Sequence, residues 1–286
     1  MTKLRGGEGI IAQQQKEFVT LRLLISPGYL SSEQLRALAD IAEREGNGKI
    51  ILSSRKGVQV PWIKFELAKD VSAELEMIGL PPGSCGRKVR TIMTCAGTNR
   101  CPFVLFNVDE LCGKFNQKYY GSMTPTKFKM SLAGCPNSCS NPYINDFGVV
   151  GAEIPKLIEE KCIQCGACAR YCRGNCIELG KDGLPNIDFD KCIKCGWCIK
   201  NCPSGALESD KKGFSVIVGG KSGRVPVLAK KIVDVVSEDE LFEVLDKTLE
   251  YFKKNAKGRE RLVEIINRNG IDHLKKEVLK GVGRES

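Results

Sequence analysis

The feature that most constrains this chain is a cysteine spacing that occurs twice. Residues 161–172 and 191–202 share the pattern Lys-Cys-Ile-x-Cys-Gly-x-Cys-x3-Cys, thirty residues apart. A repeated unit of this kind indicates two equivalent sites that are built in the same way. Thiols placed two residues apart so regularly favour metal binding over a disulfide scaffold. The chain is therefore expected to fold locally around two metal–thiolate sites.

Spacings of two, two and three residues between cysteines are typical of bacterial ferredoxins that hold two iron–sulfur clusters. In those proteins three thiolates of one run bind one 4Fe–4S cube, and the fourth reaches the other cube. The pattern predicts one cluster on Cys162, Cys165, Cys168 and Cys202. It predicts the other on Cys192, Cys195, Cys198 and Cys172. Structural zinc is the alternative, but tetrahedral zinc sites seldom use this run twice.

One residue departs from the ferredoxin pattern. Pro203 follows the last cysteine of the second run, as the pattern requires, whereas Arg173 follows the last cysteine of the first. The ligand assignment is unaffected, but the local turn is expected to differ. Cys176 is an additional thiol in the same stretch for which we expect no ligand role. Cys85 and Cys112 lack a partner at metal-binding spacing and are expected to be buried thiols.

Four further cysteines form two pairs with wider spacing: Cys95 with Cys101, and Cys135 with Cys139. Two pairs of thiolates can bind one 4Fe–4S cluster, and on spacing alone a zinc ion remains an alternative. Each pair follows a predicted strand, in a loop of the kind where functional residues gather. The surrounding Gly, Pro and Asn residues allow the backbone to approach a bulky group closely.

The sequences around these pairs resemble the signature of the sirohaem-dependent sulfite and nitrite reductase family. Residues 94–102 and 134–140 carry the resemblance. It implies that the four cysteines hold a 4Fe–4S cluster and that the Cys139 thiolate also ligates the sirohaem iron. A thiolate ligand fits a chain whose one histidine, His273, lies in a polar helical stretch. The expected cofactors are therefore sirohaem and three 4Fe–4S clusters.

Four cations match family residues that face the substrate and the cofactor: Arg55, Arg90, Lys127 and Lys129. Lys127 and Lys129 alternate onto one face of a predicted strand, which we expect to lie beside the second cysteine pair. Sirohaem carries eight carboxylates and sulfite is an anion, so these cations could clamp both and supply protons. For each of them taken alone, a solvated surface charge is the alternative.

The resemblance covers nearly the whole chain. It is similar to the catalytic subunit of anaerobic sulfite reductases and to small archaeal proteins of the dissimilatory sulfite reductase type. The expected fold is α+β: a ferredoxin-like half-domain, then a sirohaem and 4Fe–4S domain into which a two-cluster bacterial-type ferredoxin domain is inserted. We predict the half-domain at 1–80, the sirohaem domain at 81–157 and 208–286, and the insert at 158–207.

Hydrophobic periodicity gives a coarse map of the elements. In the half-domain it predicts strands at about 18–25, 49–53 and 58–62. It predicts one helix at 31–45, after the first strand, and another at 70–78, after the third. The sirohaem domain adds strands at 89–94, 128–132 and 214–218. Capping boxes at Ser31 and Ser237 predict helix starts, and two shorter helices separated by Gly270 are expected up to about Leu279.

Charge and hydropathy limit the classes of partner. The 286 residues include 44 Lys and Arg against 34 Asp and Glu, a net charge of +10 that favours anionic partners. The basic residues are spread along the chain without a nucleic-acid-binding motif, so nucleic acid is not expected. No apolar run is long enough to predict a membrane span, and Met1–Gly9 lacks the apolar core of a secretory signal. Clustered thiols in such a chain indicate the reducing cytoplasm.

The resemblance implies an enzyme that reduces sulfite to sulfide with six electrons, which enter through the inserted ferredoxin clusters. Reduction of nitrite to ammonia is the alternative reaction, and retention of Lys129 favours sulfite. A non-catalytic electron carrier that has lost sirohaem is a further alternative. No Gly-x-Gly-x-x-Gly run opens a predicted helix, so a separate donor such as a flavoprotein subunit or a ferredoxin is expected. Full-length family enzymes hold two copies of the half-domain and core, so one copy implies a homodimer or a hetero-oligomer.

Overall fold

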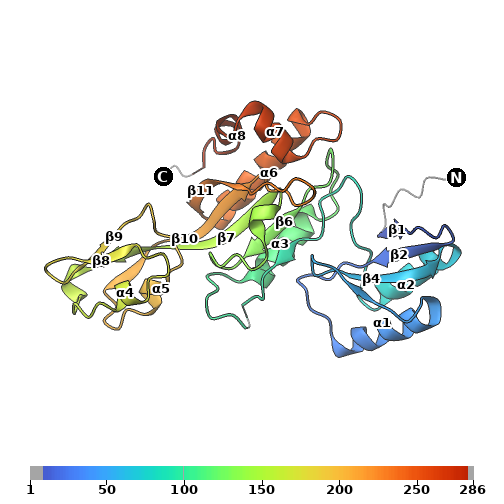
Figure 1. Cartoon of the computed structure of the whole chain (residues 1–286), viewed down its shortest axis with the longest axis horizontal. Coiled ribbons are helices and arrows are strands. Elements are labelled where there is room, and N and C mark those ends of the chain that lie inside the picture. Colours follow the sequence, from blue (N-terminus) through green and yellow to red (C-terminus); the bar gives the residue numbers. More distant parts are fainter. Residues whose placement is uncertain (1–8, 99, 283–286) are drawn as a thin grey trace.

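The computed structural model describes residues 9–98 and 100–282, and residues 1–8, where no secretory signal was expected, lie outside this range. Among the described residues, no helix combines the length and the apolar character that crossing a membrane would need. Three parts follow one another along the longest axis of the molecule (Figure 1). The N-terminal part lies at one end, and a sheet with its helices lies in the centre. The cysteine-rich segment, residues 158–206, lies at the other end.

The N-terminal part is a four-stranded antiparallel sheet with two main helices. Its elements are β1 Ile10–Ala12, β2 Phe18–Arg22, α1 Ser32–Glu45, β3 Ile51–Leu52, β4 Val58–Lys64, the 3-10 turn Phe65–Leu67 and α2 Ala68–Met77. The strand order is β1-β2-β4-β3. The predicted order of strands and helices is confirmed, with β1 added at the edge of the sheet.

The two helices pack on this sheet because each presents an apolar stripe. The Ser31 side chain accepts a hydrogen bond from Gln34 N at 3.0 Å, and Gln34 Oε1 accepts one from Ser31 N at 3.0 Å, as the capping box predicts. Leu38 of α1 and Leu75 of α2 are fully buried in one cluster with Val60 of β4. Burial of each such side chain contributes about 1.5–3 kcal/mol. Both helices therefore lie on the same face of the sheet.

The central sheet has five strands in the order β11-β10-β7-β6-β5. Its parallel strands are β5 Met93–Thr94, β6 Met130–Ala133 and β7 Phe147–Leu157. Strand β10 Leu207–Val218 pairs antiparallel with β7 on one side and with β11 Lys230–Val236 on the other. The accompanying helices are α3 Val108–Tyr119, between β5 and β6, and α6 Glu238–Asn255, α7 Leu262–Asn269 and α8 Ile271–Val278 after β11. Gly270 separates α7 from α8, as predicted.

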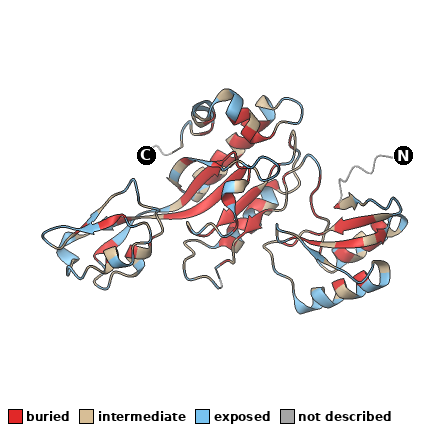
Figure 2. Cartoon of the chain, viewed as in Figure 1, coloured by how far each residue is buried: buried red, intermediate tan, exposed pale blue. Residues whose placement is uncertain are grey.

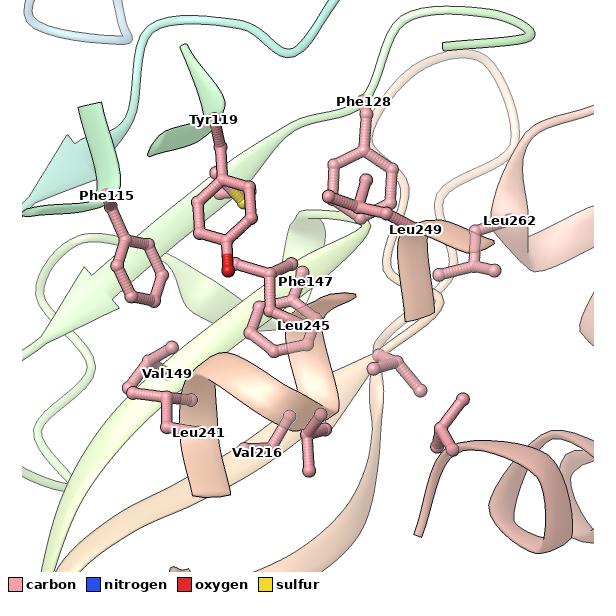
Figure 3. Close-up of a cluster of buried hydrophobic side chains, with 14 of the residues drawn as sticks. Phe115, Tyr119, Phe128, Phe147, Val149, Val216, Leu241, Leu245, Leu249 and Leu262 are labelled. Carbon is pink, nitrogen blue, oxygen red and sulfur yellow. The ribbon is translucent and has the colours of Figure 1, made fainter. Parts of the chain in front are cut away.

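Helices α3 and α6 share one hydrophobic core with a face of this sheet (Figure 3). Phe115 and Tyr119 of α3 contact Phe242 of α6, with ring centroids 5.1 and 6.1 Å apart. Phe128, just before β6, packs on Phe252 of α6 at 5.6 Å. Figure 2 shows buried residues concentrated in the central sheet and in the helix faces turned towards it. The loops at the ends of β5, β6 and β7 are therefore held by a rigid framework.

Strands β7 and β10 form a long antiparallel pair that carries the cysteine-rich segment at its tip. They pair from Phe147 opposite Val218 to Leu157 opposite Leu207. Residues 158–206 between them contain the 3-10 turn Glu159–Lys161, α4 Ala167–Arg170, β8 Ile177–Leu179, β9 Pro185–Ile187 and α5 Trp197–Lys200. The two short helices begin after Gly166 and Gly196, whose φ angles of 69° and 64° are left-handed. The duplicated sequence thus adopts the same local conformation twice.

The sequence patterns do not predict α3, β7 or β11, and the strand expected at 89–94 is much shorter. Val89 makes a single bridge with Phe128, and regular pairing begins only at Met93. Between them the Thr91 carbonyl accepts a hydrogen bond from the Arg55 guanidinium at 2.9 Å. A side chain from the N-terminal part therefore takes the place of the missing strand neighbour.

Candidate active site and cluster-binding loops

The first site is a pair of cysteine-bearing loops at one end of the central sheet. Cys95 directly follows β5, and Cys135 follows β6 after one glycine. Because β5 and β6 are parallel, their carboxyl ends meet at the same edge. Gly134 N donates to Cys95 Sγ at 3.3 Å and so joins the two loops. Burial raises the pKa of the Cys135 thiol, with smaller contributions from the other three cysteines, Cys101, Cys95 and Cys139.

Glycine is required where these loops cross β7. A Cβ atom on Gly151 of β7 would lie 2.4 Å from the Gly134 carbonyl oxygen, and one on Gly134 would lie 2.5 Å from Val104 Cγ2. The loops therefore sit directly on the sheet. Of the four thiols, Cys135 is buried and Cys139 is exposed. Cys139 is thus the member of this set that a group outside the chain can approach most easily.

The thiols are not arranged as ligands of one ion. Within residues 9–98 and 100–282, no three Cys, His, Asp or Glu side chains converge closely enough to hold a single metal ion. A zinc site draws all its sulfur ligands to about 2.3 Å from one centre. A 4Fe–4S cube instead binds each thiolate to a different iron and holds the thiolates further apart.

The cysteine-rich segment contains two small pockets, each lined by four of the thiols in the duplicated runs. One is lined by Cys162, Cys165, Cys168 and Cys202. The other is lined by Cys172, Cys192, Cys195 and Cys198. Each pocket thus combines three thiols of one run with the last thiol of the other, which is the set that the spacing assigns to each cluster. The donor set in each pocket fits an iron–sulfur cube.

Two pockets rich in cations adjoin one another at the amino-terminal ends of the parallel strands β5 and β6, opposite the loops that carry the two cysteine pairs. Both are lined by Arg22, Arg90 and Lys127. The larger, of about 1150 Å³, adds Arg87, Lys88, Lys221, Arg224, Arg259 and Arg261. The smaller, of about 450 Å³, adds Arg55 and Lys129. No carboxylate is found among the described residues that line either pocket, so both favour anionic ligands.

Arg55 brings the N-terminal part of the chain into this site. It lies in the turn between β3 and β4, and its guanidinium donates to Asn145 Oδ1 at 2.7 Å and to the Thr91 carbonyl at 2.9 Å. Burial lowers the pKa of Arg55 to about 10. The adjacent Lys56 donates through Nζ to the Cys95 carbonyl at 3.2 Å. One turn therefore contacts both the cation-rich pocket and a cysteine loop.

The lysine pair differs in environment. Burial lowers the pKa of Lys129 to about 8, and the nearby charges of Arg55, Arg261 and Lys127 lower it further in the same direction. Burial also lowers the pKa of the more exposed Lys127. Lys129 therefore gives up its proton closer to neutral pH than an ordinary lysine, whose pKa is 10.5.

Arg90 has hydrogen-bonding capacity that the chain does not use. Its terminal nitrogens donate to the carbonyls of Ser84 at 3.2 Å and Gly86 at 3.1 Å. Its Nε is buried and has no hydrogen-bond partner among the described residues. Because Arg90 lines both pockets, an anionic ligand would satisfy this donor. These features fit a large group with several carboxylates, together with a small oxyanion.

Several residues of the site are not predicted by the sequence patterns. Asp146 is fully buried and pairs with Arg261, whose Nε and Nη2 lie 3.1 and 2.5 Å from its oxygens. Asp146 also accepts from Lys129 N at 2.8 Å, so it fixes the backbone of the lysine pair. Two further site residues are not predicted: Arg22, which lines both pockets, and Asn145, which accepts from Arg55. No spacing in the sequence links these positions, although Asn145 and Asp146 stand close to the second cysteine pair.

The cations and the four thiols Cys95, Cys101, Cys135 and Cys139 lie at opposite ends of the same strands. Arg90 precedes β5 and Lys129 precedes β6, whereas Cys95 and Cys135 follow them. The four residues of β6 span about 13 Å. The expectation that Lys127 and Lys129 lie beside the cysteine pair is therefore wrong within one chain. Neither cation-rich pocket is lined by any of those four cysteines.

Of the remaining thiols, Cys85 lines the larger cation-rich pocket, whereas Cys112 and the histidine line none of the four pockets described above. Cys112 is buried in α3 beside Ser26, with 3.2 Å between Sγ and Oγ. Cys85 is buried and accepts from Arg22 Nη1 at 3.4 Å. His273 lies in α8, 3.1 Å from Tyr251 Oη. Cys176 lines the second cluster pocket, so it lies closer to that site than the sequence alone suggests.

Comparison with known proteins matches this fold and these loops to one family. Residues 85–285 match the family described as nitrite and sulphite reductase 4Fe-4S domain, and residues 11–78 match the nitrite/sulfite reductase ferredoxin-like half domain. The coenzyme F420-dependent sulfite reductase of Methanocaldococcus jannaschii is 38% identical over 93% of this chain. The chain spans 43% of that relative's length, less than half.

Two further relatives cover most of the chain. One subunit of the anaerobic sulfite reductase of Salmonella typhimurium is 29% identical over 90% of this chain and 82% of its own length. The crystal structure of dissimilatory sulfite reductase I has the same fold, with a TM-score of 0.75 and 24% identity over 91% of this chain and 69% of that one. The chain therefore belongs to the nitrite and sulphite reductase family.

Proposed function

We propose that this chain is the catalytic unit of a sirohaem-dependent sulfite reductase. Sulfur passes from the +4 to the −2 oxidation state, so hydrogen sulfite takes up six electrons and six protons and yields hydrosulfide and three waters. The observation that carries the proposal is the pair of adjoining cation-rich pockets, which suits an anionic substrate beside a cofactor with many carboxylates. Relatives named sulfite reductases align over most of the chain.

The proposed cofactors are sirohaem and three 4Fe–4S clusters. Cys95, Cys101, Cys135 and Cys139 would hold the coupled cluster, with Cys139 also ligating the sirohaem iron. When bound, this assembly would supply electrons at the iron where the substrate binds. Cys162, Cys165, Cys168 and Cys202, and Cys172, Cys192, Cys195 and Cys198, would hold the two clusters of the proposed insert, residues 158–207.

The chain itself would bind the oxyanion and deliver protons. Arg55 and Arg90 are donors that can hold the oxygens of a small anion as their negative charge grows. Lys129, with its pKa lowered to about 8, is the best-placed proton donor for the oxygens that leave as water. Lys127 lies next to it and lines both pockets. Asp146 holds the backbone of Lys129 in place.

The site would be completed by a second chain. The proposed iron ligand and the proposed proton donors lie at opposite ends of the central strands, so the two halves of one complete site would come from different chains. We therefore infer a homodimer or a pairing with a related subunit, in which the cations of one chain face the sirohaem bound by the other. Electrons would come from a separate donor, a flavoprotein subunit or a ferredoxin. Thiolate clusters suit the reducing cytoplasm.

The test is a spectrum and a turnover assay on protein purified without oxygen. The proposal predicts a tetrapyrrole absorption band, about 13 irons per chain and faster reduction of sulfite than of nitrite by dithionite-reduced methyl viologen. Faster reduction of nitrite would indicate that nitrite, and not sulfite, is the substrate. About 12 irons with no tetrapyrrole band and no turnover would show an electron carrier and refute the enzyme.

A further inference from the structure

Arg173, the residue that departs from the ferredoxin pattern, contacts a different part of the chain. Its guanidinium carbon lies 4.3 Å from the centroid of the Phe103 ring and 5.3 Å from that of Trp197. The two rings are themselves 4.6 Å apart. Phe103 lies two residues after Cys101, and Trp197 lies between Cys195 and Cys198. The three side chains therefore join the loop of one proposed cluster to the pocket of another.

A second cation flanks the same contact. Lys200 donates through Nζ to the Pro102 carbonyl at 2.8 Å and lies 5.5 Å from the Trp197 ring. The pocket of Cys162, Cys165, Cys168 and Cys202 is not equipped in this way. Its residues at the positions of Trp197 and Lys200 are Ala167 and Arg170, and Pro203 stands at the position of Arg173. The duplicated units have thus diverged where one of them meets the core.

The backbone brings the same pocket towards the core. Glu153 N of β7 donates to the Lys194 carbonyl at 2.8 Å, and Glu153 bridges Cys195 in a parallel register. Glu153 lies two residues from Gly151, which packs on Gly134 beside Cys135. The pocket of Cys162 instead reaches β7 at Leu157, about 13 Å further along the strand.

We propose that Arg173, Trp197 and Phe103 form a cation–π clamp that fixes the order of the clusters. This rests on the proposed function. In it, the inner relay is the pocket of Cys172, Cys192, Cys195 and Cys198, which lies next to the loop of Cys95 and Cys101. The pocket of Cys162, Cys165, Cys168 and Cys202 is then the outer site, which receives electrons from the flavoprotein or ferredoxin donor. With the clusters bound, electrons would pass one at a time, and each transfer would oxidise one cluster and reduce its neighbour. Arg173 acts as a positioning residue.

The clamp can be tested in the anaerobic holoprotein with Arg173→Gln, the conservative Arg173→Lys and the matched exposed control Arg170→Gln. Hydrogen exchange of the amides in 101–106 and 194–200 should become about two- to five-fold faster in Arg173→Gln. The Arg173→Lys protein should keep most of the protection, and the control should match the wild type. Phe103→Leu should reproduce the effect of Arg173→Gln from the other side of the contact.

A second readout separates positioning from simple packing. In dithionite-reduced protein, magnetic interaction between the inner cluster and the Cys95 cluster, seen by electron paramagnetic resonance, should weaken in Arg173→Gln at unchanged iron content. Unchanged exchange and unchanged magnetic interaction in both Arg173→Gln and Phe103→Leu would overturn the clamp. The exchange measurement needs neither sirohaem nor sulfite, so it stands even if wild-type turnover fails and the proposed function with it.

Discussion

At the scale of single residues, the site is built from cations that oppose each other. Besides burial, the nearby positive charges of Arg55 and Arg261 lower the pKa of Lys129. Only one buried carboxylate among the described residues near them, Asp146, offsets this repulsion. Such an arrangement costs stability in the absence of a ligand and gains it when an anion binds.

Lys129 should set a limb of the pH profile. Its pKa of about 8 lies below the ordinary value of 10.5, so sulfite turnover that uses its proton should fall as pH rises through about 8. Lys129→Met should lower kcat roughly 100-fold and remove this limb. Steady-state kinetics from pH 6 to 10 would measure both effects, with the exposed Lys253→Met as control. A Lys129→Met enzyme with the wild-type pH profile would contradict the role.

The same shift has a consequence for stability. Because the folded chain holds this proton less tightly than the unfolded chain, the group destabilises the fold fully below about pH 8. That unfavourable contribution disappears as pH rises towards 10.5. The Lys129→Met protein should therefore gain most in stability over the wild type on the acidic side of pH 8.

At the scale of elements, one buried ion pair ties two segments together. Asp146 stands just before β7, and Arg261 stands just before α7 with its side chain only 10% exposed. Asp146→Ala would leave Arg261 buried without its partner, which should cost about 3–5 kcal/mol in the free energy of unfolding. Denaturant unfolding followed by circular dichroism would measure it. The exposed Asp40→Ala control should change the free energy of unfolding by less than about 0.5 kcal/mol. An equally small change for Asp146→Ala would show that the ion pair with Arg261 does not hold the two segments together.

The elements also show which parts of the fold the sequence can predict. Capping boxes and clear apolar periodicity predict α1 and α6, because these signals are local. The duplicated cysteine run predicts the grouping of thiols that line each small pocket, since the spacing is itself the geometry. By contrast, no local signal predicts that Arg55 donates to the Thr91 carbonyl just before the short strand β5, because the two residues lie far apart in sequence. Asp146 and Arg261 are likewise 115 residues apart, and no local signal joins them.

At the scale of the whole molecule, the proposed place of electron entry lies apart from the proposed place of the chemistry. The cysteine-rich segment projects on the β7 and β10 pair, and the N-terminal part lies at the other end (Figure 1). The central sheet presents thiols at one end of its parallel strands and cations at the other. A single chain of this design offers two half-sites, which explains why we expect it to work with a second copy.

Mixing two inactive variants tests this arrangement. Cys139→Ser lacks the proposed iron ligand, and Lys129→Met lacks the proposed proton donor. In a homodimer with shared sites, subunit exchange should restore about one quarter of wild-type turnover, because half of the dimers are mixed and each mixed dimer has one intact site. Mixtures that stay as inactive as either parent, although mass spectrometry shows exchanged dimers, would refute sites shared between two copies.

The most direct measurement is sulfite turnover by Cys139→Ser protein with dithionite-reduced methyl viologen, compared with wild type and with Cys112→Ser as a buried-thiol control. Cys139→Ser is expected to fall to background, because the thiol proposed to join the cluster to the tetrapyrrole iron is gone, while about eight irons remain bound in the cysteine-rich segment. Turnover by Cys139→Ser at the wild-type rate would contradict this expectation.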